Sequence, residues 1–283
     1  MSSSSASQPV YQRLYTREIF TNIEAELAND GYLFELHNNS GNTAKSKNAN
    51  RSAGLGAEGL PPGARRTGNI VSFQDERNLR GVQARRRPHL FFPAYNSSTI
   101  FEGPNKTEQE TRETFARILK EFEESEEGVA IASLVKAQLK GVVVDKIIAF
   151  GLGRIGFLRP GPLQSFYEHA AAKVVANAVA EVLGEFGFDV IEGFGAKGFA
   201  IMDNKTVALA HHPSFPFRAI IADIARPALI CMREESATAE RSLLRADLDT
   251  TNSRGMLKEY SGVSLQVSAR QKAFWDNVWY VRT

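Results

Sequence analysis

The stretch "DKIIAFGLGRIGFLRPG", residues 145 to 161, places a short apolar run directly before Gly-Leu-Gly-Arg-Ile-Gly. A short run rich in Ile and Phe before a glycine turn predicts a buried strand. Gly151, Gly153 and Gly156 have the spacing of turns that bind a dinucleotide between a strand and a helix. This stretch therefore predicts an α/β fold, and it raises the question of whether a nucleotide cofactor binds at the turn.

Two features of the sequence argue against such a cofactor. Pro160 and Pro162 keep the chain extended, so no helix N-terminus is expected inside the motif to meet a phosphate. An acid that binds the ribose is expected about twenty residues after the turn. The first acid that ends a predicted strand is Glu192, which comes much later. We expect the glycines to serve close packing of strand, loop and helix and expect no cofactor; the alternative is a nucleotide-cofactor enzyme using Gly151–Gly156.

Strands and helices alternate in the pattern that follows residue 142. Short apolar runs separated by helical stretches favour a Rossmann-like, mainly parallel sheet with helices on both faces. The predicted strands are "VDKIIAF", "FDVIEG", "KTVALA", "PALICM" and "NVWYVR", and the predicted helices are "SFYEHAAAKVVANAVAEVLGEFG", "RAIIADIA" and "ATAERSLLRADL". The helix over residues 164–186 is expected to be nearly continuous.

The region before this alternation divides into three parts. Residues 1–36 form an N-terminal helical segment, since apolar residues recur at helical spacing over residues 11–29. Residues 37–69 are small, polar and rich in Gly and Asn, which predicts a disordered linker. The α/β domain is expected over residues 70–283. It opens with a helix whose Thr107 and Glu110 match a capping box and which we expect to end at Gly128; a second helix is expected to close at Gly141.

The composition is that of an ordinary globular protein. A formal net charge of +2, from 34 basic and 32 acidic side chains, gives no broad field for nucleic acid or membrane. Cys231 is the only cysteine in the sequence, so no internal disulfide forms. No stretch has the length and hydropathy of a membrane span or a secretory signal, which favours a cytoplasmic or nuclear location. The arginines from Arg80 to Arg87 are too few to predict nucleic-acid binding, and we expect a solvated run there.

Two histidines lie where open α/β sheets place ligands. His169 is near the start of the helix that follows the glycine turn, on a polar stripe, and we expect it to face solvent or another helix. His211 follows the strand "KTVALA" and points to the same edge of the sheet. No third ligand at a recognisable spacing accompanies His211 and His212, so no metal site is predicted. Cys231 lies in an apolar run and is expected to be a buried small hydrophobe.

Five segments in order give the chain a family resemblance. "KIIAFGLGRI", "EHAAA", "LGEFGFDVIEG", "KTVALAHHPSFP" and "IIADIARPALICM", together about residues 140–235, resemble the sensitivity-to-red-light-reduced-like domain in its fungal form, and "FWDNVWYVR" resembles the end of such proteins. The resemblance implies a Rossmann-like domain in an intracellular eukaryotic protein, without an established activity for the family.

By position, the resemblance carries over the glycine turn and both histidines. His169 matches the histidine of a Gln-His-Ala segment in the family, although Glu168 replaces the Gln. One departure is an apparent internal deletion of about one strand-containing segment between "VVANAV" and "LGEFGFDV", which would have supplied an acid near the ligand site. A shortened gene model would explain this departure.

These observations define the expected function. We expect a regulatory or interaction protein that works through a protein partner, without catalysis, membrane association or nucleic-acid binding. The candidate ligand-binding residues are Gly151, Gly153, Arg154, Gly156, His169 and His211.

Overall fold

The computed structural model describes residues 13–28, 33–37, 43–47, 65–75, 79–80, 94–101, 107–152, 163–183, 195–211, 213, 215–234, 247, 249–265, 267, 273–274 and 277–283. The helices in these residues are α1 (Arg17–Ala28), α5 (Glu108–Glu123), α6 (Glu126–Gln138), α7 (Gln164–Leu183), α8 (Lys197–Ile201), α9 (Phe217–Ile224) and α10 (Thr251–Leu257). The strands are β1 (Leu33–His37), β2 (Thr43–Lys47), β3 (Arg65–Phe73), β4 (Ala94–Phe101), β5 (Lys146–Phe150), β6 (Thr206–Ala210), β7 (Leu229–Arg233), β8 (Tyr260–Ser264) and β9 (Asn277–Arg282).

A five-stranded mixed sheet with the order β5-β6-β7-β9-β8 forms the centre of the α/β part of the structure. β5, β6 and β7 run parallel, in the register Ile148 to Ala208 to Ile230. All five residues of β6 are buried, as expected for a parallel strand covered on both faces. The α/β class and these three strands confirm the sequence expectation.

The sheet is less parallel than the sequence predicted. β9 pairs antiparallel with β7, and β8 pairs antiparallel with β9. Periodicity identified "NVWYVR" as a strand but carries no information on its direction. β8 was not predicted, because "YSGVS" contains glycine and serine and buries only Tyr260.

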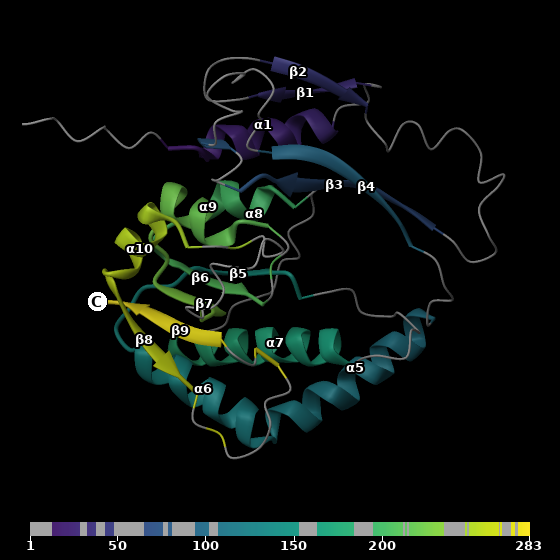
Figure 1. Cartoon of the computed structure of the whole chain (residues 1–283). Coiled ribbons are helices and arrows are strands. Elements are labelled where there is room, and N and C mark those ends of the chain that lie inside the picture. Colours follow the sequence, from purple (N-terminus) through teal and green to yellow (C-terminus); the bar gives the residue numbers. More distant parts are fainter. Residues whose placement is uncertain are drawn as a thin grey trace, which may run out of the picture.

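Helices cover both faces of the sheet (Figure 1). α7 lies below the sheet with α5 and α6 beneath it, whereas α8, α9 and α1 lie above. Each face has its own buried core: Val175, Leu229 and Trp279 belong to the lower core. On the upper side, Phe199 stacks on Phe150 with their ring centroids 4.3 Å apart. The two cores agree with the prediction of a covered sheet.

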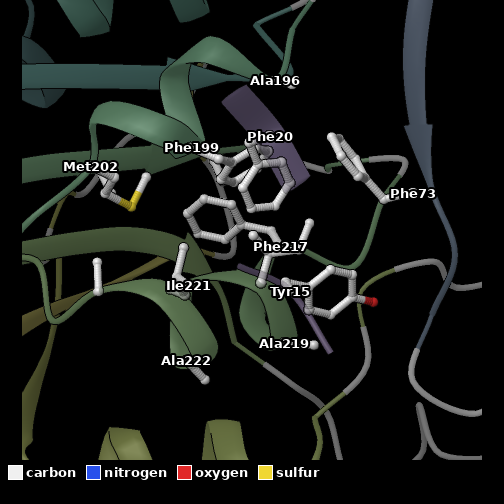
Figure 2. Packing of buried hydrophobic residues seen from close by; sticks show 14 of the residues in the cluster. Tyr15, Phe20, Phe73, Ala196, Phe199, Met202, Phe217, Ala219, Ile221 and Ala222 are labelled. Carbon is white, nitrogen blue, oxygen red and sulfur yellow. The ribbon is translucent and has the colours of Figure 1, made fainter. Parts of the chain in front are cut away.

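The upper core includes the N-terminal segment (Figure 2). Phe20 of α1 lies against Phe199, with ring centroids 5.1 Å apart, and Tyr15 is fully buried beside them. Glu24 accepts hydrogen bonds from the backbone nitrogens of Ala196 and Lys197, at 2.7 and 2.8 Å, where α8 begins. α1 is therefore part of the same packed unit as α8.

A buried carboxylate fixes the start of that segment. Asp223 of α9 accepts hydrogen bonds from the backbone nitrogens of Leu14 and Tyr15, at 2.8 and 3.0 Å. Its other oxygen accepts from the side-chain nitrogen of Asn252 in α10, at 2.7 Å. The side chain of Asp223 thus joins the segment before α1 to α9 and α10.

The helices α5 and α6 correct one detail of the prediction. Thr107 and Glu110 form the predicted capping box of α5. α5 ends at Glu123, however, and Gly128 lies in the first turn of α6, where Ser125 caps it. A Cβ at Gly128 would overlap the carbonyl oxygen of Phe122, so this glycine allows the two helices to meet at a tight corner and does not end the first.

Residues 37–69 differ in part from the predicted linker. β2 pairs antiparallel with β1, and Arg65 to Asn69 belong to β3, which pairs with β4. Backbone pairing of this kind requires little apolar surface, which is why composition alone did not predict it. The remainder of 37–69 lies outside the described residues, as do the predicted strand "FDVIEG" and most of the predicted helix "ATAERSLLRADL". α7 is continuous to Leu183, as predicted.

Among the helices that the structure describes, none is long and apolar enough to cross a membrane.

Candidate functional site

The glycine turn and the end of β6 meet at the carboxyl edge of the parallel strands. Gly151 follows β5 directly and has a φ of +70°, a conformation that favours glycine. A Cβ at Gly151 would lie 2.8 Å from the carbonyl oxygen of His211, which follows β6. The structure therefore brings together two of the predicted site residues. Gly153, Arg154 and Gly156 lie outside the described residues.

His211 is buried between α7 and β9. Its Nε2 atom lies 3.4 Å from Oε1 of Glu168 in α7. Its Nδ1 atom lies 3.3 Å from Oδ1 of Asn277, the first residue of β9. The rings of Phe274 and His211 pack edge to face, at 5.9 Å between centroids. The imidazole thus connects a helix on one side to a strand on the other.

Two further side chains extend this arrangement. Gln164, at the start of α7, donates a hydrogen bond from Nε2 to Oε1 of Glu168 at 3.0 Å. Asn277 donates from Nδ2 to Sγ of Cys231 at 3.4 Å. We refer to Gln164, Glu168, His211, Cys231 and Asn277 as the edge cluster. It joins α7, β6, β7 and β9 at the carboxyl end of the parallel strands.

Burial dominates the acid–base properties of the edge cluster. It raises the pKa of Glu168 to about 7, against the opposing effect of the hydrogen bond from Gln164. Burial also raises the pKa of the Cys231 thiol to about 12, again against a hydrogen bond, here from Asn277. Cys231 is therefore a neutral thiol at physiological pH and not an activated nucleophile. The expectation of a buried small hydrophobe at Cys231 agrees with this environment.

The contacts of Asn277 indicate which nitrogen of the His211 imidazole carries the proton. Because the amide nitrogen of Asn277 donates to Cys231, its oxygen faces His211 and accepts from Nδ1–H. In the neutral imidazole, Nε2 is then an acceptor and points at Glu168. A proton between Nε2 and Oε1 satisfies both atoms. Nε2 of His211 and Oε1 of Glu168 thus face each other at 3.4 Å.

His169 lies outside the edge cluster. Its Nδ1 atom is 2.7 Å from the carbonyl oxygen of Ser165, four residues earlier in α7. Successive residues of a helix point about 100° apart, so Glu168 faces His211 and His169 is turned away. His169 is half-buried, and the structure does not test its predicted role in binding a ligand.

Sequence reasoning missed Glu168 and Asn277 as site residues. The resemblance marked Glu168 as a departure at the position beside His169. An acid on the Ala- and Val-rich helix α7 is the signal that could have found it, because buried acids require a partner. Asn277 is a polar residue at the start of the otherwise mostly apolar strand "NVWYVR". Neither signal indicates the partner, which only the fold supplies.

No group of three or more His, Cys, Asp and Glu side chains that could hold a metal ion occurs in the part of the chain that the structure describes. Arg80, the first of the predicted arginine run, is half-buried, and Arg85, Arg86 and Arg87 lie outside the described residues.

Comparisons with known proteins give no relative for this chain: no family model, no curated protein and no solved structure matches it.

Proposed function

We propose that the protein is an intracellular regulatory or interaction protein, cytoplasmic or nuclear, whose α/β domain is Rossmann-like and resembles the sensitivity-to-red-light-reduced-like domain. In this proposal the domain works through a protein partner, and its glycine turn serves packing. The mixed sheet with three parallel strands and two covered faces is compatible with such a domain.

The observation that carries the proposal is that the polar groups at the carboxyl edge bind one another. The side chains of Glu168 and His211 are 7% and 3% exposed and contact each other. A catalytic acid or base must reach the substrate within hydrogen-bond distance. Groups that are buried and mutually bonded in this way support a structural or regulatory role over a catalytic one.

A second candidate function is a nucleotide-cofactor enzyme. Gly151 favours it, because a glycine at positive φ with a close backbone neighbour, directly after a parallel strand, is also how dinucleotide sites begin. The helix that follows β5 in the described residues begins only at Gln164. In dinucleotide sites the helix begins at the turn itself, so that its amides meet the pyrophosphate.

A ligand panel separates the two candidates. The full chain is melted in the presence of nicotinamide dinucleotides, flavins, S-adenosylmethionine and nucleoside triphosphates at millimolar concentration. A ligand that binds only the folded state raises the melting temperature by mass action. We expect no shift, and no nicotinamide dinucleotide binding by calorimetry tighter than a Kd of about 1 mM, or about −4 kcal/mol. A micromolar Kd for any of these ligands overturns the proposal and establishes the enzyme candidate.

The partner itself is tested by cross-linking with the full chain in cells. We expect a protein whose cross-links map to surface residues of the folded α/β part and which exchanges with unlabelled full chain in a competition experiment. Heat-denatured chain is the matched control, because chaperones bind it while a specific partner does not. Recovery of the same proteins with folded and denatured chain contradicts the interaction role.

A further inference from the structure

β8 is the outermost strand of the central sheet, on the far side of β9 from β7 (Figure 1). Among the strands that the structure describes, none pairs with the other side of β8. Ser261, Gly262 and Ser264 are exposed, and only Tyr260 is buried. An unpaired strand of this kind presents backbone N–H and C=O groups to which another strand can bond. The open edge of β8 is therefore a surface on which a second chain can add a strand.

The pairing with β9 determines which backbone groups of β8 point outward. The backbone nitrogen of Thr283 donates to the carbonyl oxygen of Glu259 at 3.0 Å, in line with the antiparallel register of the two strands. Bonded and non-bonded pairs alternate along an antiparallel ladder. Every second residue after Glu259 therefore bonds to β9, whereas the backbone N–H and C=O groups of Gly262 and Ser264 point away from it.

β8 lacks the features that commonly protect an exposed sheet edge, which are charged residues, prolines, bulges and very short strands. Its sequence, YSGVS, has no charge and no proline, and its register with β9 is unbroken from Tyr260 to Ser264. It is as long as β5, β6 and β7. By contrast, β5 at the other end of the sheet begins with Lys146, whose Nζ lies 2.8 Å from Oδ2 of Asp203. The unprotected edge of β8 favours a strand that is used for pairing.

We propose that β8 is a dimerisation strand, which pairs antiparallel with β8 of a second copy of this chain and joins the two five-stranded sheets into one. The two-fold axis passes through the pair that Gly262 makes with Gly262 of the second copy. Ser264 then lies opposite Tyr260 of the second copy. The proposal does not depend on the proposed function.

This register follows from the outward-facing positions. Tyr260, Gly262 and Ser264 alternate along the strand, and centring the pair on Gly262 lets all three positions bond to the second copy. A shift of one strand by two residues would leave one of these positions without a partner. The register is therefore the one in which the edge of β8 is most fully paired.

The sequence of β8 is compatible with a second copy of itself. A two-fold axis normal to the sheet reverses the strand but keeps each face of the sheet on its own side, and a two-fold interface requires a self-complementary surface. The side-chain pairs are Tyr260 with Ser264, Ser261 with Val263, and Gly262 with itself. No like charges face each other in these pairs, which would oppose pairing.

Sedimentation of the full chain tests the dimer. The interface is small, so association is followed up to about 500 μM, and wild type should show a concentration-dependent equilibrium of monomer and dimer. Ser264→Pro removes an outward N–H and keeps the bonds to β9, so it should raise the dimer Kd at least about tenfold. Ser264→Thr retains the N–H and is the matched control, with the Kd of wild type. Gly262 is not substituted, because a Cβ there would lie 3.1 Å from Val278.

Cross-linking tests the register. Ser261 and Val263 of the second copy form a non-bonded pair, whose Cα atoms lie about 4.5 Å apart and within reach of a disulfide. An equimolar mixture of Ser261→Cys and Val263→Cys, oxidised at high protein concentration, should therefore give cross-linked dimer. Each variant oxidised alone should give several-fold less. The native Cys231 is buried and is present in every sample, so it does not account for a difference.

Three results overturn the proposal. The first is a wild-type chain that stays monomeric to about 500 μM. The second is a Ser264→Pro variant that is folded by circular dichroism and dimerises as tightly as wild type. The third is a mixture of the two cysteine variants that cross-links no more than each variant alone. If Ser264→Pro does not fold, sedimentation of wild type and the cysteine mixture decide.

Discussion

Two buried acid–base clusters lie at different places in this molecule, and they differ in kind. In the first, Arg218 of α9 binds Asp247 and Asp249 at 3.3 and 2.9 Å and also donates to the carbonyl oxygen of Arg233. In the second, the edge cluster, Glu168 faces His211 at 3.4 Å. The first cluster uses a base that is always charged, whereas the second contains a carboxyl group whose pKa burial raises to about 7.

The difference appears in the acid–base behaviour of each cluster. Burial acts to lower the pKa of Arg218, but the charges of Asp247 and Asp249 outweigh it and the pKa is raised. Burial raises the pKa of Asp247 to about 6 against the charge of Arg218, so Asp247 is ionised at pH 7. Arg218 keeps its charge at every physiological pH, so the Arg218 cluster is an ion pair at pH 7, and Asp247 loses its charge only as pH falls through about 6. Glu168 of the edge cluster changes its charge near pH 7. The comparison shows that the partner of a buried acid decides how it responds to burial: a guanidinium keeps the acid charged at neutral pH, whereas an imidazole and an amide do not.

The largest expected effect comes from breaking the Arg218 cluster. Arg218→Met leaves two aspartates buried without their cation, which should lower the free energy of unfolding by about 3–5 kcal/mol at pH 7. Denaturant unfolding measures it. The double variant Arg218→Met with Asp247→Asn should recover part of the loss, because one of the two carboxylates that have lost Arg218 is removed. A loss below about 1 kcal/mol would place this cluster among exposed ion pairs.

The next effect concerns the titratable cluster. The stability of Glu168→Gln minus that of wild type should increase as pH rises from about 4.5 to about 7, and level off above. The sign follows because wild-type Glu168 has a raised folded pKa, of about 7, and loses its contribution over that window. A rise in the pKa of Glu168 from 4.5 to about 7 corresponds to about 3 kcal/mol of stability.

The matched control for this measurement is Glu108→Gln on α5, whose side chain is 79% exposed. Its difference profile should be flat within about 0.5 kcal/mol. Parallel profiles for the two variants between pH 4.5 and 8 would show that Glu168 titrates like an exposed glutamate, and the proposed contrast with the Arg218 cluster would then be wrong.

A smaller effect tests how tightly the edge cluster is fitted to the glycine turn. Gly151→Ala combines a positive φ with a Cβ placed 2.8 Å from the carbonyl oxygen of His211, and should cost about 2 kcal/mol. Gly141→Ala has a comparable φ of +78° and no atom within 4 Å, so it should cost only about 1 kcal/mol of backbone strain. Equal midpoints in urea for the two variants would show that the close contact carries no energy.

The smallest effect is expected at His169. His169→Asn removes an imidazole whose hydrogen bond, in the part of the chain that the structure describes, lies within its own helix turn. It should change the free energy of unfolding by less than about 0.5 kcal/mol. His211→Asn should cost several times more, since it leaves Glu168 buried without the imidazole. If the two variants lose equal stability in thermal unfolding, His211 contributes no more than His169 and its place in the edge cluster carries no energy.

The sequence predicted the parts of this fold that local patterns determine. The strand "KTVALA", the strand "PALICM" and the capping box at Thr107 each depend on neighbours in the chain, and each is confirmed. β8 and β2 were missed, because pairing with another strand decides their structure. The sequence placed Gly151 and His211 at the same edge of the sheet, but it did not predict that β5 and β6 are neighbours or that the two residues meet. The contact with Glu168 was not predicted either, because the angle at which α7 packs on the sheet is a tertiary property.

The hydrogen bonds from Leu14 and Tyr15 to Asp223 have a consequence for how the chain is made. They join residues separated by 209 and 208 positions. Leu14 and Tyr15 therefore cannot form these hydrogen bonds until Asp223 has been synthesised. Until the second half of the chain has been synthesised, Phe20 of α1 also lacks Phe199, against which it packs. Long-range contacts of this kind close late and leave apolar surface exposed meanwhile. The N-terminal segment should therefore stay undocked, with Phe20 and its neighbours exposed, until α9 has been synthesised, and a chaperone that binds apolar segments would find it accessible during translation.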